Sequence, residues 1–366
     1  MYMKERNEKK QLAIFSMIAF GLPVIMGLFM WYGYSNNKNL DLFSMAHMYY
    51  PAAGAMIALL LSNSNHKLIP KPFFICYLLQ TAMMIGISLF SLFSNSEALP
   101  QLSGLLMIVG GMLLWLCLLI AKKDRRAAYG LSRKNWKATI WMVALYVILY
   151  TARMVVAYAA EGNLSGMLEI FTKSAVWIAL LSTLVSYIPL FVPYFGEEYG
   201  WRYFFQPILQ KRYGSLKGVL ILGVLWGLWH LPLNFFFYTS PADGLISVTN
   251  QVVVCLTLGI FYAYAYMKTD NIWTVVAMHF LNNNLVPIFS GDLTGESAKG
   301  YSITWSMVGM MAILMTICYA WPALTKFFKD RGNLNPTPEH RADTLAYNLE
   351  NENEQKTATL NQSPAK

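Results

Sequence analysis

Charged side chains are scarce in this sequence. Of its 366 residues, 13% are Asp, Glu, Lys or Arg, whereas 56% are hydrophobic. Soluble domains average about 25% charged residues, so this deficit excludes an ordinary soluble globular protein. The mean hydropathy of +0.40 points the same way. The composition therefore predicts an integral membrane protein.

Cysteine is also scarce. The four cysteines lie far apart in apolar stretches, and no CxxC pair occurs: Cys76, Cys117, Cys255 and Cys318. This pattern argues against a disulfide scaffold and against a thiolate metal site. It favours cysteines that pack in helices as small hydrophobic side chains.

Long apolar stretches account for most of the chain. A helix needs about 20 predominantly apolar residues to cross a hydrocarbon core of about 30 Å. Ten stretches meet this requirement: 11–33, 46–63, 72–95, 102–121, 138–159, 174–195, 218–238, 245–267, 271–289 and 303–325. We therefore predict an all-α fold, a polytopic transmembrane helical bundle of about ten helices. No internal repeat is visible, which disfavours the inverted-repeat architecture of many transporters.

Basic residues are distributed unevenly between the connecting segments. If the N-terminus is cytoplasmic, the outer segments hold only Lys38, Lys173 and Lys299, and the other loop lysines and arginines face the cytoplasm. The positive-inside rule thus predicts a multi-pass protein, in the cell membrane, with cytoplasmic N- and C-termini. The net charge of +9 then faces anionic lipid, so we expect the bilayer as a partner and no nucleic acid.

Ionisable residues within the membrane are costly and usually functional. Here they fall in one stretch: Glu197 and Glu198 at the end of a span, and His230 and His279 well inside two others. At 1.5 Å per residue, His230 lies about 18 Å and His279 about 12 Å from the cytoplasmic face. We therefore expect these side chains to meet in a cavity in the cytoplasmic half of the bilayer, open toward the cytoplasm.

The spacing of these residues separates their faces. Glu198 and Arg202 are four residues apart and can form an ion pair on one helix face. Glu197 points about 100° away and is free for another contact. His279 and Asn283 are again four apart, so both can face one cavity.

Two kinds of hydrolytic site fit these groups. A carboxylate beside a histidine can deprotonate water, while a second histidine and an amide donate to the oxyanion. Alternatively, His230, His279 and Glu197 could ligate a catalytic zinc ion, with water as fourth ligand. The zincin motif HExxH is absent, and Asn283 suits the oxyanion role better. A proton relay in a proton-coupled transporter is a third possibility.

Three motifs in this stretch resemble those of the CPBP intramembrane proteases, which include CAAX prenyl endopeptidases and ABI-like bacteriocin-processing or self-immunity proteins. The family motifs EExxxR, FxxxH and HxxxN or HxxxD correspond here to EEYGWR at 197–202, WGLWH at 226–230 and HFLNN at 279–283. Trp226 departs from the motif's Phe. The resemblance covers about residues 174–289.

The resemblance implies an endopeptidase that hydrolyses membrane-associated protein or peptide substrates, with a zinc requirement left open. Glu197 and His230 would activate water, His279 and Asn283 would stabilise the oxyanion, and Glu198 and Arg202 would order the site. A non-catalytic immunity or scaffold protein of the same fold remains an alternative.

The expected organisation has four parts. Residues 1–160 form N-terminal transmembrane helices of unknown role, 174–289 the protease-like core, 303–325 the final span and 326–366 a disordered cytoplasmic tail.

Overall fold

The computed structural model describes all residues except 1, 63–65, 95, 97, 297–298 and 363–366. Every regular element within the described part is a helix, which confirms the predicted all-α class. The N-terminal half contains α1 (Tyr2–Ala19), α2 (Gly21–Ser35), α3 (Asp41–His47), α4 (Tyr50–Ser62), α5 (Lys71–Ser91), α6 (Ala98–Ile120), α7 (Lys123–Ala128), α8 (Trp136–Ala160) and α9 (Leu164–Ile170). The central segment contains α10 (Ser174–Leu190), α11 (Val192–Glu198), η2 (Tyr199–Phe205), α12 (Gln206–Tyr213), α13 (Ser215–Trp229), α14 (Leu231–Leu233) and η3 (Asn234–Tyr238). The chain continues with α15 (Gly244–Thr269), α16 (Ile272–Ser290), α17 (Trp305–Met315), η5 (Thr316–Ala320) and α18 (Pro338–Gln362).

The predicted membrane spans are present in this structure. Among the described residues, nine helices are long and apolar enough to cross a membrane, and ten if α9 and α10 count as one span bent by 71°. The prediction of about ten spans is thus confirmed. The predicted span 174–195 corresponds to this bent pair, whose second helix ends at Leu190 and is followed by α11.

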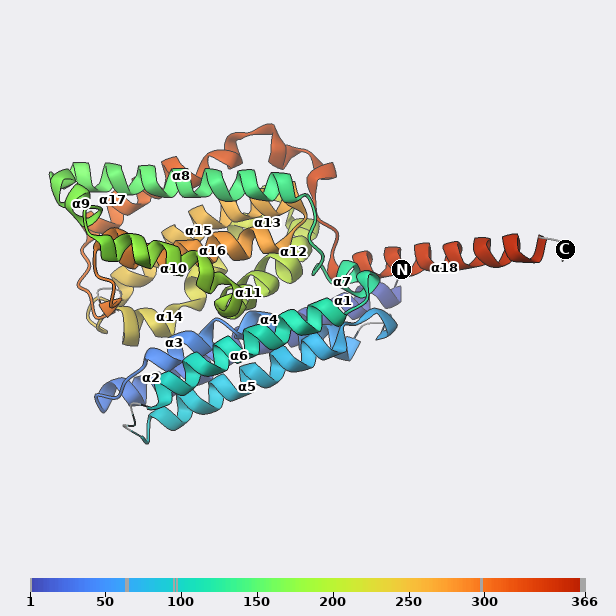
Figure 1. Cartoon of the computed structure of the whole chain (residues 1–366), viewed down its shortest axis with the longest axis horizontal. Helices are drawn as coiled ribbons and strands as arrows, with labels where there is room; N and C mark the ends of the chain where they lie inside the picture. The colour runs from blue at the N-terminus through green and yellow to red at the C-terminus, as the bar shows by residue number, and fades with distance from the viewer. Residues whose placement is uncertain (1, 63–65, 95, 97, 297–298, 363–366) are drawn as a thin grey trace.

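The motif-bearing helices lie in the middle of the bundle. In Figure 1, α5 and α6 run along one side and α8 along the opposite side, with α11, α13, α15 and α16 between them. Helix α13 packs on α15, and α11 packs on both α4 and α16. The ionisable residues of the motifs are buried among these helices, as polar groups at membrane depth require.

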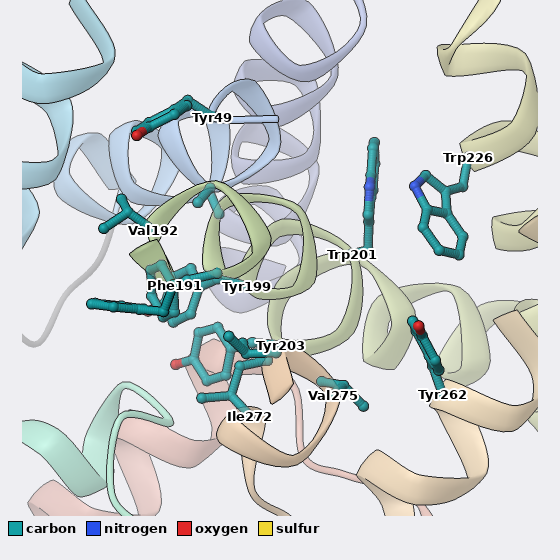
Figure 2. Packing of buried hydrophobic residues seen from close by; sticks show 14 of the residues in the cluster. Tyr49, Phe191, Val192, Tyr199, Trp201, Tyr203, Trp226, Tyr262, Ile272 and Val275 are labelled. Carbon is teal, nitrogen blue, oxygen red and sulfur yellow. The ribbon is translucent and has the colours of Figure 1, made fainter. Parts of the chain in front are cut away.

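The α11–η2 segment is fixed by aromatic stacking and by a close contact with α4. The ring of Tyr199 stacks on that of Phe195 at 4.9 Å and on that of Tyr203 at 4.5 Å between centroids. Gly200 permits the contact on the other side, since a Cβ there would lie 2.7 Å from the carbonyl oxygen of Pro51 in α4. Figure 2 shows Tyr199, Trp201 and Tyr203 on this segment, and the ring of Trp201 packs against those of Phe15 and Trp229.

The two ends of the bundle differ in charge. We call the end formed by residues 121–135, 210–217 and 268–271 the basic end, because it gathers the loop lysines and arginines. The other end, here the loop end, is formed by 36–41, 237–243, 291–296 and 299–304. There Lys299 pairs with Asp41 at 3.0 Å, and the backbone nitrogen of Tyr301 donates to the carbonyl of Tyr238 at 3.0 Å.

The C-terminal tail differs from the predicted disorder. Residues 338–362 form α18, which projects from the basic end (Figure 1). Its first turns are anchored because Arg341 pairs with Asp270, whose carboxylate also accepts hydrogen bonds from Lys134 at 2.6 Å and Asn335 at 2.9 Å. Burial alone would raise the pKa of Asp270, but the hydrogen bonds and charges of Arg341 and Lys134 outweigh burial and lower it. The low apolar content of this segment predicted disorder. Apolar content does not reveal an ion pair such as that between Arg341 and Asp270.

Candidate active site

One cavity collects the four predicted catalytic side chains. Glu197 at the end of α11, His230 at the α13–α14 junction, and His279 and Asn283 on α16 all line a cavity of about 620 Å³. This volume is typical of ligand sites. A larger hollow of about 1070 Å³ at the basic end contains none of the four, so the smaller cavity is the candidate site.

Glu197 is held by the aromatic residue that departs from the family motif. The indole Nε1–H of Trp226 donates to Oε2 of Glu197 at 2.7 Å, and the glutamate is 2% exposed. A hydrogen bond to a carboxylate is stronger than one between neutral groups. Trp226 therefore fixes one oxygen of the carboxylate and leaves the other for a different partner.

His230 lies where the helix is interrupted. Its backbone nitrogen bonds to the carbonyl of Gly227 at 3.2 Å, one residue short of the α-helical pattern, and Pro232 follows. The ring Nδ1 lies 2.8 Å from the carbonyl oxygen of Trp226. Because a carbonyl only accepts, Nδ1 carries the proton and Nε2 keeps a lone pair in the neutral ring. The neutral imidazole can thus accept a proton at Nε2.

Glu198 connects His279 to Arg202. One carboxylate oxygen accepts from Nδ1 of His279 at 2.8 Å and the other from Nε of Arg202 at 3.0 Å. Both Glu198 and Arg202 are fully buried, so this is not the surface ion pair that their spacing alone would also fit. The guanidinium lies over the ring of Trp226 at 4.9 Å. The pair orients His279 and packs against the residue that holds Glu197.

Asn283 is oriented by two residues that its motif does not include. The hydroxyl of Tyr146 donates to Oδ1 of Asn282 at 2.8 Å, and Nδ2 of Asn282 donates to Oδ1 of Asn283 at 2.9 Å. With Oδ1 engaged, Asn283 offers its NH₂ group as a donor. Asn284, in contrast, donates to the hydroxyl of Tyr194 and the carbonyl of Phe280, as an interhelical packing residue would.

His47 is a cavity residue that sequence reasoning missed. It is 1% exposed, lines the same cavity, and its ring centroid lies 6.1 Å from that of His230. Nε2 lies 3.1 Å from the carbonyl of Trp229 and donates to it. The available signal was its position as the second residue of the predicted span 46–63, where an ionisable group is already unusual.

The cavity does not open toward the end of the bundle that the distribution of basic residues predicted. Its lining beyond the four residues includes Met45 of α3, and Asp41, Tyr238 and Glu296 of the loop end. On the basic side, Tyr199, Tyr203 and Tyr266 are at most 1% exposed and fill the space. The cavity lining thus reaches the loop end and not the basic end, unlike the predicted opening. The depth of a residue says how far its side chain lies from one end of the bundle, but not which route other side chains leave unfilled.

Comparison with known proteins agrees with the motifs. Residues 179–285 match the family model described as type II CAAX prenyl endopeptidase Rce1-like. This segment is similar to that family over about a third of the chain. The resemblance to CPBP proteases is therefore confirmed, and the matched segment contains all three motifs.

A relative also aligns with part of the chain. A protein named CAAX prenyl protease 2 from Methanococcus maripaludis is 32% identical over 92 residues, which cover 24% of this chain. The chain spans about a third (34%) of the length of that curated relative. No solved structure is significantly similar to this chain. The match to the family model does not extend to His47 or Tyr146.

The zinc alternative can be compared with the arrangement of these side chains. Within the described residues, no three His, Cys, Asp or Glu side chains are grouped so that they could hold a metal ion. Glu198 engages Nδ1 of His279, the carbonyl of Trp226 engages Nδ1 of His230, and an indole engages Glu197. These bonds leave Nε2 of both histidines and one oxygen of Glu197 available, as the outer hydrogen bonds of metal ligands do, but the three side chains are not gathered closely enough to form a ligand set. Zinc binding stays a prediction, and the mechanism below uses none.

Proposed function

We propose that this protein is an intramembrane endopeptidase that hydrolyses peptide bonds of membrane-associated proteins or peptides with a water molecule activated by Glu197 and His230. The observation that carries the proposal is the convergence of these two residues with His279 and Asn283 on one cavity. The family of residues 179–285 supports the reaction class. The name of the relative, CAAX prenyl protease 2, suggests prenylated C-terminal peptides as one substrate class to test.

The proposed reaction steps follow from which side-chain atoms carry a proton and which can accept one. Glu197 takes a proton from water as the water oxygen attacks the scissile carbonyl carbon, and Nε2 of His230 accepts the hydrogen bond that orients this water. The oxyanion that forms accepts hydrogen bonds from the NH₂ group of Asn283 and from a protonated Nε2 of His279. Glu197 then returns its proton to the leaving amine as the C–N bond breaks, which regenerates the carboxylate.

His279 can serve this role because of Glu198. With Nδ1–H directed to the carboxylate at 2.8 Å, a donor at Nε2 requires the imidazolium form. Glu198 supplies the counter-charge, and Arg202 keeps that carboxylate in place at 3.0 Å. Glu198 and Arg202 are thus positioning residues in this scheme.

The rival function, proton-coupled transport, uses the same ionisable groups. A transport path must connect to both faces of the membrane in turn. Here the cavity ends on the basic side against buried tyrosines, which favours a one-sided chamber for chemistry. A non-catalytic scaffold role is disfavoured because the six Glu, Arg, His and Asn residues of the motifs are intact and four of them line one cavity.

The test compares cells that naturally produce the protein with cells carrying Glu197→Gln. New peptide termini in the membrane fraction are identified by mass spectrometry. We expect a set of termini that disappears in Glu197→Gln and persists in Glu169→Gln, a control at an exposed site on α9. Identical termini in all three strains, with normal protein levels, would contradict the proposal.

A further inference from the structure

We propose that substrate enters the cavity from the loop end, which the charge distribution places outside the cytoplasm, so that the substrate is a peptide segment exposed at the extracytoplasmic surface of the membrane. The substrate class in this inference rests on the proposed function. The entry route does not depend on that function and rests on the cavity alone. It also assigns a task to the N-terminal helices.

The first support is the path of the cavity wall. From His279 the lining continues along α16 through Asn283 and Val286 to Pro287, always toward the loop end. It then reaches Thr294 and Glu296 of the following loop. Asn283 and Val286 are exposed, the latter to 40%. An open route therefore extends from the reacting groups to this end of the bundle.

The second support is the closure of the opposite end. Glu198 and Arg202 are fully buried on that side of Glu197. Behind them the stacked rings of Tyr199 and Tyr203 pack at 4.5 Å between centroids (Figure 2). Farther out, Arg341 of α18 is bound to Asp270. A peptide that approached from the basic end would have to displace a buried ion pair and several aromatic side chains, which is strongly unfavourable.

The third support is charge. The basic end carries Lys122, Lys123, Arg125 and Arg126 within five residues, whereas Lys38 and Lys299 are the basic residues of the loop end as defined above. By the positive-inside rule the basic end faces the cytoplasm. The mouth therefore faces the other side.

The N-terminal helices complete this mouth. Met45 of α3 and Ser103 of α6 line the cavity opposite α16, although both lie outside the family segment. We infer that α3 and α6 form the wall along which the substrate backbone lies. At about 3.3 Å per residue, an extended peptide reaches from the mouth to a site about 15 Å deep with four to five residues.

The route is tested by accessibility of single cysteines in a variant whose four native cysteines are replaced by alanine. Glu296→Cys and Met45→Cys report the mouth, Val286→Cys the cavity wall, and Lys123→Cys and Lys217→Cys the basic end. Spheroplasts are treated with a membrane-impermeant maleimide before or after permeabilisation, and total cysteine is measured after denaturation. Size-exclusion profiles show which variants are folded.

We expect the mouth and wall cysteines to react at least tenfold faster than Lys123→Cys and Lys217→Cys in sealed spheroplasts, with the difference lost on permeabilisation. The reverse pattern overturns the proposal, as does a Val286→Cys that reacts only after permeabilisation. The Glu197→Gln variant should be labelled in the same way, so this outcome is independent of whether the protein is a protease.

The substrate class is tested in the set of termini described above. Termini that depend on Glu197 should lie in segments of membrane or exported proteins on the extracytoplasmic side. Termini in cytoplasmic segments would overturn the inferred route while leaving the protease function intact. If no termini depend on Glu197, the protease function fails instead, and the labelling pattern still decides the route.

Discussion

The indole nitrogen of Trp226 donates a hydrogen bond of 2.7 Å to the carboxylate of Glu197. The two residues come from different motifs, 29 positions apart in the chain. Trp226 also carries the carbonyl that receives Nδ1–H of His230. One residue thus orients both members of the proposed water-activating pair, and it does so with an atom that the phenylalanine of the family motif lacks.

Replacing Trp226 by Phe should lower kcat by a factor of about 10 to 100 with little change in KM, because a hydrogen bond to a charged group contributes about 1.5–3 kcal/mol. The aromatic ring and the backbone carbonyl remain, so folding should be preserved. Trp136→Phe is the matched control, since Trp136 is 63% exposed at the start of α8. Unchanged kcat in Trp226→Phe would show that the indole N–H has no role in catalysis.

Asn283→Ala should reduce kcat by a factor on the order of 10²–10³, the usual effect of losing an oxyanion donor. The control is Asn284→Ala, which removes packing hydrogen bonds to Tyr194 and Phe280 and should affect thermal stability more than kcat. Equal losses of kcat in both variants would contradict the oxyanion role.

Tyr146→Phe should have a smaller effect, about three- to tenfold on kcat, because it frees Asn282 and only indirectly Asn283. In the double variant with Asn283→Ala, the tyrosine substitution should add nothing, since both act on one donor. Independent, multiplicative losses would mean that Tyr146 acts by another route.

Hydropathy and spacing predicted much of this protein. The length of each apolar stretch predicted the spans. In lipid the backbone N–H and C=O groups must be hydrogen-bonded within the protein, and outside a β-barrel only a helix achieves this. The three motifs pointed to Glu197, His230, His279 and Asn283, which line one cavity in the structure, because polar groups are rarely placed in a membrane without a function.

Other features depend on contacts between distant segments. His47 and Trp229 are 182 residues apart, and no local pattern indicates that the two will meet. The hydrogen bond from Trp226 depends on the indole's orientation, which spacing does not encode. The direction of the cavity depends on which side chains fill the space, and Tyr199 and Tyr203 read in sequence as ordinary apolar residues.

The contact between α4 and the η2 segment predicts a steric effect. Gly200→Ala should destabilise the protein and lower activity, because its Cβ would lie 2.7 Å from the carbonyl oxygen of Pro51. Gly86→Ala is the matched control, as a Cβ on this α5 glycine meets no atom within 4 Å. Thermal unfolding in detergent should show a lower midpoint for Gly200→Ala only. Equal midpoints would contradict tight packing of α4 on the η2 segment.

Asp270 should make the free energy of unfolding depend on pH under acidic conditions. Its folded pKa is lowered by Arg341 and Lys134, so its contribution is fully present above the unfolded value of about 3.9 and is lost as pH falls through the folded pKa. Asp270→Asn should therefore lower the unfolding midpoint at pH 7, and the gap to wild type should narrow below about pH 4. A gap that stays constant down to pH 2 would contradict this linkage, and Glu169→Gln serves as the exposed control.

The most direct test of the account is single-turnover cleavage by purified protein in proteoliposomes, with a peptide that spans a cleavage site found in cells and with H₂¹⁸O as solvent. Wild type should place one ¹⁸O atom in the new carboxyl terminus. Glu197→Gln should be slower by a factor on the order of 10²–10⁴, while Glu169→Gln keeps the wild-type rate. A Glu197→Gln variant that cleaves at the wild-type rate would contradict the central claim that Glu197 activates the attacking water.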